Sequence, residues 1–166
     1  HRHVCRNEGI AIEWIYEYLK YDNIKISAND WETNFNFELL TDKQFVYLPN
    51  YYPVGFFNTN KPKPITKKVL NVGCFGAIRP LKNQLIQAVA AIDFADTYKK
   101  KLRFHINTQR IEGRGEPVLK NLRELFKNNP RHELIEHGWL SHNEFIDLVQ
   151  RMDIGLQVSF SETFNI

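Results

Sequence analysis

Residues Lys68-Val-Leu-Asn-Val-Gly-Cys-Phe75, which Gly76 follows, form the clearest structural signal in the chain. A short run that contains valine and leucine and ends at glycines is typical of a buried strand that leads into a tight turn. We therefore predict a strand over Lys68–Phe75 and a flexible loop after it.

Helices and strands are then predicted in regular alternation to the end of the chain. The further strands are expected at Leu102–Asn107, Glu133–Glu136 and Ile154–Val158, and the helices at Leu81–Tyr98, Pro117–Asn128 and Ser141–Met152. The residues expected to face the core are Leu85, Ala88, Val89 and Ile92 in the first helix and Leu119, Leu122, Leu125 and Phe126 in the second. The third helix begins with a Ser141-x-x-Glu144 capping box. This alternation predicts an α/β fold with a Rossmann-like parallel sheet flanked by helices, whose ligands bind beyond the carboxyl ends of the strands.

Residues 1–60 are aromatic-rich and irregular by comparison. We expect a helix over Ile10–Tyr21 and short strands at Asn23–Ser27 and Phe45–Leu48. A run with two prolines, Lys61-Pro-Lys-Pro-Ile-Thr-Lys-Lys68, then divides the chain. We interpret this run as a solvated linker, with a phosphate or membrane patch as the alternative.

The composition is that of a globular chain. Of its 166 residues, 43% are hydrophobic and 25% are charged, which excludes a disordered tail. No window approaches the ~18 consecutive apolar residues of a transmembrane helix. The net charge of +3 is too small for a dedicated nucleic-acid binder. Cys5 and Cys74 are expected to be reduced thiols in a cytoplasmic chain, without the spacing of a zinc site. Because the chain begins at His1 and its only methionine is Met152, we expect a piece of a longer protein.

The loop after the first strand of the alternating region is where an anion is expected to bind. Gly73–Asn83 matches neither the G-x-G-x-x-G pattern nor the P-loop pattern. Arg79 and Lys82 lie where the next helix should start, and cations and backbone N–H groups at such a place suit a diphosphate. The alternative is that both side chains are simply solvated.

Two later loops also follow predicted strands and therefore lie at the same edge of the predicted sheet. In His137-Gly-Trp-Leu-Ser141, we interpret Trp139 as a partly buried packing residue, with base stacking as the alternative. In Ser159–Ile166, Ser161 is expected to cap a helix. The negative charge of Glu162 is expected to stabilise this helix, because it would lie near the positive end of the helix dipole. We expect no metal, because no convincing ligand set is formed by His105, His132, His137 and His142.

Three motifs in these loops have a combined order and spacing that point to one family. They are Gly76-x-x-x-Pro80-Leu-Lys-Asn83, His137-Gly-Trp-Leu140 and Met152-Asp-Ile-Gly-Leu-Gln-Val-Ser-Phe-Ser-Glu-Thr-Phe164. Together they resemble the group 1 (family 4-like) retaining glycosyltransferases of the B-type two-domain fold. Phe45-Val-Tyr-Leu-Pro-Asn50 resembles the segment that enters the interdomain linker of that family. The resemblance spans about residues 45–166. It implies the tail of an acceptor-side N-terminal domain at 1–50, an interdomain linker at 51–67 and a nucleotide-sugar-binding domain at 68–166 that is incomplete at its C-terminus.

The resemblance also implies an activity in carbohydrate biosynthesis. A sugar would pass from a nucleoside-diphosphate sugar to an unknown glycan, lipid or protein acceptor with retention of configuration. The expected location is the cytoplasm or the membrane periphery, with no metal, no other cofactor and no nucleic-acid partner, and the piece alone is expected to be inactive. The alternative is a non-catalytic nucleotide-binding or assembly module of the same fold. A flavodoxin-like regulator is a third interpretation.

Residue roles follow from the same resemblance. Lys82 matches the lysine that holds the donor diphosphate, whereas the usual arginine position is Ala77, so Arg79 is expected to substitute two residues on. Glu162 matches the acidic residue that holds hydroxyls of the donor sugar, and a second acidic residue would fall eight positions later, beyond the last residue of the chain. The catalytic candidates are thus Lys82, Arg79 and Glu162. The donor-binding candidates are Gly76, Ala77, Gly138, Trp139, Leu140, Thr163, Phe164 and Asn165.

Overall fold

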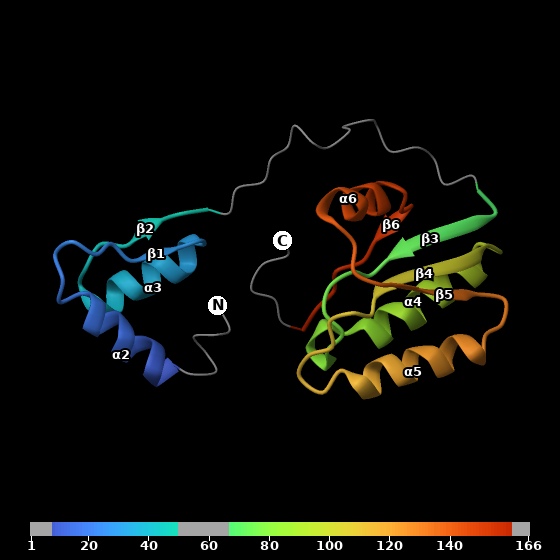
Figure 1. Ribbon diagram of the computed structural model, residues 1–166, viewed down its shortest axis with the longest axis horizontal. Coiled ribbons are helices and arrows are strands. Elements are labelled where there is room, and N and C mark those ends of the chain that lie inside the picture. The colour runs from blue at the N-terminus through green and yellow to red at the C-terminus, as the bar shows by residue number, and fades with distance from the viewer. Residues whose placement is uncertain (1–7, 50–66, 161–166) are drawn as a thin grey trace. The chain divides into compact units, whose positions relative to one another are not determined.

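The computed structural model describes residues 8–49 and 67–160 (Figure 1). The chain divides into two compact units, and residues 8–49 belong to the first and residues 67–160 to the second.

In residues 8–49, the described part of the first unit, there are two helices and a pair of very short strands. Its elements are α2 (Glu8–Tyr18), β1 (Ser27–Ala28), α3 (Trp31–Thr41) and β2 (Val46–Tyr47). The two strands pair in parallel. Asp30 caps α3, because its carboxylate accepts a hydrogen bond from the Thr33 N–H at 2.7 Å. Phe37 and Phe45 stack with 5.5 Å between ring centroids and are the buried apolar side chains of the described part of this unit.

Helix α3 was not expected from the sequence, whereas a helix near Ile10–Tyr21 and two strands were. The reason is that α3 is not amphipathic in the usual sense. Trp31 and Leu39 are each 69% exposed and Phe35 is 60% exposed, so large apolar residues lie on its solvent face. A pattern in which apolar residues line both faces has no clear helical period.

The second unit is an α/β structure with a four-stranded parallel sheet flanked by helices, as the alternating pattern predicts. The strands are β3 (Val69–Gly73), β4 (Lys101–Asn107), β5 (Glu133–His137) and β6 (Ile154–Gly155). The helices are the 3₁₀ turn η2 (Pro80–Lys82), α4 (Gln84–Thr97), α5 (Glu116–Lys127) and α6 (His142–Gln150). The strand order is β5-β4-β3-β6, and every pairing is parallel. The chain therefore moves outward in one direction from β3 to β5 and then crosses to the other side of β3.

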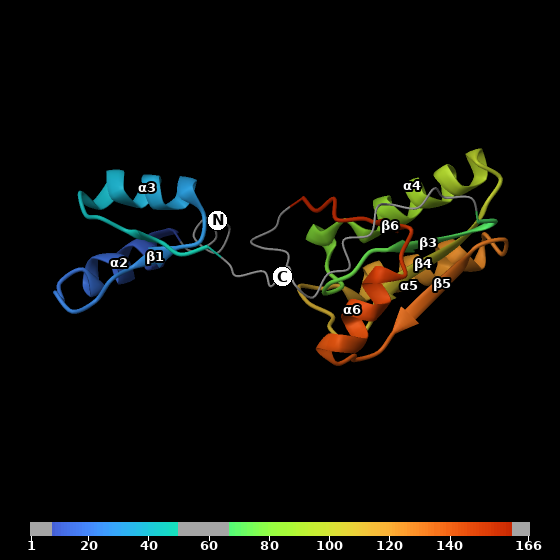
Figure 2. The same ribbon diagram turned by 90° about the horizontal axis from the view of Figure 1, so that it is seen from above.

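The two faces of this sheet are covered differently. Helices α4 and α5 cover one face, and α6 lies on the other (Figures 1 and 2). Leu70, Leu102 and Phe104 are fully buried in the cluster that α4 and α5 cover. On the other face, the ring of Phe145 from α6 packs edge-on against Phe75, with centroids 5.3 Å apart. The core thus lies mainly beneath α4 and α5.

The structure corrects the prediction of one continuous helix over Leu81–Tyr98. Asn83 has a φ of +56° and separates η2 from α4. Val89 is wrongly predicted as a core residue, because it is 47% exposed, whereas Ala91 and Ala95 on the same helix are buried. Ala91 and Ala95 were not expected in the core because alanine carries a weak hydrophobic signal, whereas Ala88 was expected there and is buried.

The last strand is also shorter than the predicted Ile154–Val158. After the Leu156 N–H donates to the Gly73 carbonyl at 2.8 Å, the chain leaves the sheet. The Val158 N–H then donates to the Gln87 side chain on α4 at 3.0 Å. By contrast, the capping box of Ser141 and Glu144 is confirmed at the start of α6. The expected helix cap at Ser161 lies outside the described residues.

Candidate functional site

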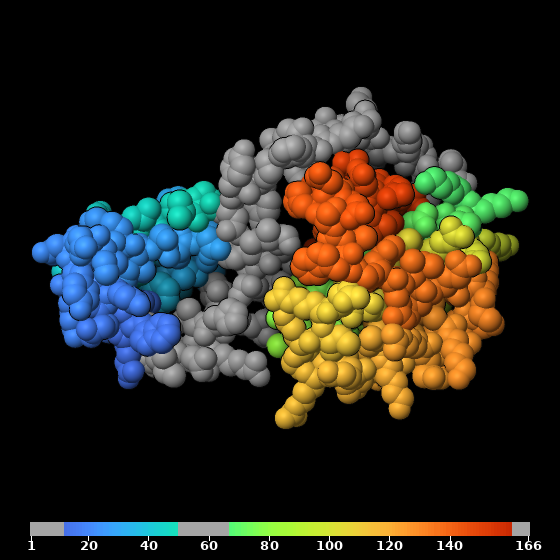
Figure 3. All heavy atoms as spheres, in the orientation of Figure 1, coloured from blue at the N-terminus to red at the C-terminus, as the bar shows by residue number. Residues whose placement is uncertain are grey.

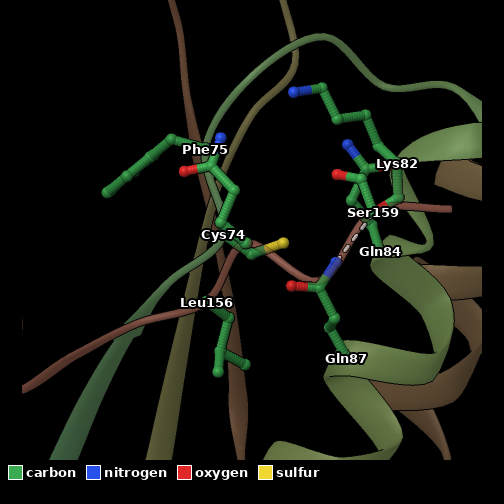
Figure 4. Close-up of a pocket in the computed structure, with 8 residues that line it drawn as sticks. Cys74, Phe75, Lys82, Gln84, Gln87, Leu156 and Ser159 are labelled. Carbon is green, nitrogen blue, oxygen red and sulfur yellow. Dashed lines mark hydrogen bonds between the residues drawn. The ribbon is translucent and has the colours of Figure 1, made fainter. Parts of the chain in front are cut away.

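A small pocket opens where the strand order changes direction, at the carboxyl ends of β3 and β6. Open parallel sheets place their ligands at this point of the topology. The lining residues are Cys74, Phe75, Lys82, Gln84, Gln87, Leu156, Gln157 and Ser159 (Figure 4). The space among them is about 160 Å³ with open solvent included, and the lining atoms leave essentially no enclosed room even for a water molecule. The pocket, as the structure has it, is therefore too tight to enclose a nucleotide sugar.

Lys82 is held close to the turn that follows β3. A side-chain Cβ at Gly76 would lie 3.4 Å from both Cε and Nζ of Lys82. Gly76 has a φ of +114°, which L-residues rarely adopt, so the turn itself requires glycine. Figure 4 shows the Lys82 side chain extending toward the loop after β3. The structure therefore brings together two residues that the sequence assigns to one phosphate site.

Two buried glutamines on the first turns of α4 fix the backbone around Lys82. Gln87 is 4% exposed, and its Nε2 donates to the Lys82 carbonyl at 2.7 Å (Figure 4). Gln84 is 1% exposed, and its Nε2 donates to the Ala77 carbonyl at 2.8 Å. Neither glutamine was expected from the sequence to be buried, because a polar residue near a helix start is usually solvated. Their spacing was the available signal, since Gln84 and Gln87 lie on the same helical face as Ala88 and Ala91.

The segment after β6 is tied to the turn that carries Lys82. The Asn83 side-chain amide donates to the Val158 carbonyl at 3.3 Å, and the Phe160 N–H donates to the Leu81 carbonyl at 3.0 Å. The segment that leads toward Glu162 therefore runs along one wall of the pocket. The predicted residues Glu162, Thr163, Phe164 and Asn165 themselves lie outside the described residues.

Arg79 occupies a different position from Lys82. Its guanidinium faces Glu112 of the loop after β4, with 3.9 Å between Nη1 and Oε2. Its buried Nε has no hydrogen-bond partner among the described residues. The backbone N–H of the preceding Ile78 donates to the Arg110 carbonyl at 2.8 Å, which holds the two loops together. Arg79 is not among the residues that line the pocket, so Lys82 is the cation that the described structure places there.

Cys74 lines the pocket, but its thiol is unreactive. The residue is 2% exposed, and burial raises the pKa of its thiol to about 12, although the nearby Lys82 charge acts in the opposite direction. A thiol with such a pKa is protonated at neutral pH and is not a nucleophile. Its role in the second unit is apolar packing beneath the pocket.

The loop after β5 presents its tryptophan to solvent. Trp139 is 84% exposed, so the interpretation of this ring as a partly buried packing residue is wrong for the described structure. Leu140 is half-buried, and Gly138 is exposed. A Cβ at Gly138 would meet only Gln109 Nε2, at an ordinary contact distance of 3.6 Å, so packing does not demand glycine there. None of these residues lines the small pocket.

A chain of polar side chains crosses the α6 face of the sheet. The Asn71 amide Nδ2 donates to Asp153 at 3.2 Å, which turns the amide oxygen of Asn71 toward His105 Nε2 at 3.3 Å. On this assignment His105 donates through Nε2–H and accepts at Nδ1 from His137 Nε2–H, at 2.9 Å. The two imidazole rings are nearly parallel, with centroids 5.2 Å apart. Burial, followed by the neighbouring His137 and Arg103, lowers the pKa of His105 to about 4.

The network gives His105 and His137 a structural role. His132 is buried as well, and its Nδ1 accepts from the Leu102 N–H at 3.0 Å.

Among residues 8–49 and 67–160, no group of three or more His, Cys, Asp or Glu side chains is arranged to hold a metal ion. Over the same ranges, every helix is too short or too polar to cross a membrane.

Comparison of the chain with protein-family models, with curated proteins and with solved structures gave no match. The fold alone gives the class of the second unit, which is an α/β unit of the Rossmann-like kind with a small pocket at the switch point of its parallel sheet.

Proposed function

We propose that the chain carries the donor-binding part of a retaining glycosyltransferase of the B-type fold. One observation carries the proposal: the ammonium of Lys82 lies over the positive-φ turn at Gly76, beside a pocket at the switch point of the sheet. A lysine ammonium at the mouth of such a loop is a common partner of a phosphate group, which would bind at the surface beside the Gly76 turn. The rest of the nucleotide would lie along the neighbouring loops.

The proposed transfer needs stabilisation of negative charge at this place. The bond between the anomeric carbon and the β-phosphate oxygen breaks, and the electron pair stays on the phosphate. The acceptor oxygen bonds to the anomeric carbon on the same face, and its proton passes to the departing phosphate oxygen. Lys82 would stabilise the charge that develops on the leaving phosphate, because preorganised charges act most strongly in the transition state. Glu162 would hold hydroxyls of the sugar, and no metal or other cofactor is required in the proposal.

The proposal is tested by calorimetric titration of the chain with uridine, guanosine and adenosine diphosphates. We expect one of them to bind and Lys82→Ala to weaken it about 10- to 100-fold, the range for a lost hydrogen bond to a charged group. Lys127→Ala, at the far end of α5, removes the same charge away from the pocket and is expected to change nothing. If none of the diphosphates binds to the folded chain, the proposal is wrong.

A non-catalytic nucleotide-binding or assembly module is the second candidate. The observation that favours it is the pairing of Arg79 with Glu112, which leaves Lys82 as the cation of the described pocket. The two candidates differ in turnover of a nucleotide sugar. Release of the nucleoside diphosphate from a nucleotide sugar supports the enzyme, and tight binding without any release supports the module.

A further inference from the structure

The amino ends of β3 and β4, at the opposite end of the sheet from the pocket, carry a concentration of cations. The register pairs Val69 with Lys101, so the starts of the two strands lie side by side. We call this surface the basic edge, and it consists of Lys67, Lys68, Lys99, Lys100, Lys101 and Arg103. Figure 1 shows the starts of both strands at the end of the unit where α4 terminates, and the side chains where β3 begins (green) project from that end in Figure 3.

Charge on the basic edge is only partly neutralised. Lys67 pairs with Asp153 at 3.2 Å, and Glu133 serves both Lys101 and Arg103. In the described part of the chain, two carboxylates thus serve three of these six cations, so the basic edge keeps a net positive charge. Asp96 at the end of α4 does not change this balance, because Arg131 pairs with it at 2.8 Å.

The backbone holds these lysines in a fixed arrangement. The Lys100 Nζ donates to the Lys67 carbonyl at 2.6 Å, and the Lys101 N–H donates to the Lys68 carbonyl at 3.0 Å. Lys68 and Lys99 are exposed. Like charges fixed close together repel one another, so binding of an anionic surface would relieve a repulsion that the folded unit contains.

An exposed aromatic pair borders the basic edge. Phe94, on the last turn of α4, and Tyr98, the residue that follows this helix, have ring centroids 4.6 Å apart and are 39% and 60% exposed. Tyr98 directly precedes Lys99 in the chain. Amphipathic aromatic rings next to lysines are favoured at the interface between lipid headgroups and water.

We propose that the basic edge docks the second unit on an anionic phospholipid surface. The lysines would be attracted by the headgroup charges, with the Phe94–Tyr98 pair at the level of the headgroups. Five of the six cations are lysines, which act as compact hydrated point charges suited to a diffuse negative surface. Arginine, which binds single phosphates with a two-pronged geometry and dominates nucleic-acid recognition, contributes one. A membrane is therefore favoured over RNA.

The experiment is cosedimentation of the chain with phosphatidylcholine vesicles that contain or lack phosphatidylserine. We expect binding only when phosphatidylserine is present, and loss of binding at about 1 M salt, where the Debye length is about 3 Å. Each lysine removed should weaken binding about fivefold. The double variant Lys68→Gln and Lys99→Gln is therefore expected to bind roughly 25-fold more weakly. Circular dichroism checks that the variant is folded.

A matched control removes two positive charges at the other end of the second unit, where the strands of the sheet have their carboxyl ends. Arg114→Gln together with Lys120→Gln, both exposed positions, should leave vesicle binding unchanged. Absence of binding to anionic vesicles at low salt, or an equal effect of both double variants, would overturn the proposal. Tighter binding to a single-stranded polyuridine probe than to the vesicles would also overturn it and assign the basic edge to nucleic acid. The readout needs no nucleotide, so it stands apart from the test of Lys82.

Discussion

At the scale of single residues, His105 shows how a fold can hold a titratable group neutral. It is 8% exposed, and its Nδ1 accepts a hydrogen bond from His137 that protonation of His105 would abolish. Protonation would also place a charge beside Arg103, on the same strand. Both effects act in the same direction as burial, which accounts for a pKa of about 4.

This pKa predicts a specific loss of stability in mild acid. The pKa of His105 is near 6.5 in the unfolded chain and about 4 in the folded one. The contribution of neutral His105 to the free energy of unfolding is therefore complete above pH 6.5 and is lost as the pH falls toward 4. The loss is at most roughly 3 kcal/mol. NMR titration of the His105 Cε1 proton should show a midpoint near 4, and urea unfolding at several pH values should show a smaller pH dependence in His105→Gln. A midpoint near 6.5 would contradict the prediction.

At the scale of elements, the site depends on how α4 begins. Gln87 bridges two segments that are far apart in sequence, the turn at Lys82 and the chain after β6, which it holds at Val158. Replacement by an apolar side chain would leave a carbonyl and an N–H without their partner. Val158 is 62% exposed, so water can satisfy its N–H, and the cost is that of one buried group left unsatisfied, about 1–3 kcal/mol.

We therefore expect Gln87→Leu to lower the free energy of unfolding by about 1–3 kcal/mol and to speed hydrogen exchange at the Val158 amide. Gln109→Leu makes the same chemical change at an exposed position and should stay within about 0.5 kcal/mol of the parent chain. Urea denaturation and amide-exchange NMR measure the two effects. Unchanged exchange at Val158 would show that the bridge does not hold the segment.

The elements also show what the sequence could and could not predict. The strands and helices of the second unit follow from the alternation of apolar runs and glycine or capping signals, and the proximity of Gly76 and Lys82 follows from the loop that joins β3 to α4. Contacts between distant segments could not be predicted, because they have no local pattern. The pairing of Arg79 with Glu112 and the bridge made by Gln87 are both of this kind.

At the scale of the whole chain, the second unit presents two charged ends with different chemistry. The pocket at the carboxyl ends of the strands combines Lys82 with buried glutamines, and the basic edge at the amino ends carries the excess positive charge. Because the pocket and the basic edge lie at opposite ends of one sheet, a surface bound at the basic edge would leave the pocket accessible. The proposed donor site and the proposed docking surface are therefore compatible.

The two units should differ in stability, because they bury different amounts of apolar surface. In the described part of the first unit, the buried apolar side chains are Phe37 and Phe45, whereas an extended cluster beneath α4 and α5 stabilises the second. Apolar burial is the main favourable term in folding, and small cores leave little net stability. We expect the first unit to unfold first.

Tryptophan fluorescence can separate the two transitions. Trp14 and Trp31 lie in the first unit, where Trp31 stacks on Tyr47 with 4.1 Å between centroids, and Trp139 lies in the second. In a Trp139→Phe variant, the fluorescence therefore reports the first unit alone, while far-UV circular dichroism is dominated by the longer helices of the second. The midpoint by fluorescence should fall at a lower urea concentration than the midpoint by circular dichroism. Two coincident midpoints would instead mean that the whole chain unfolds as one cooperative structure.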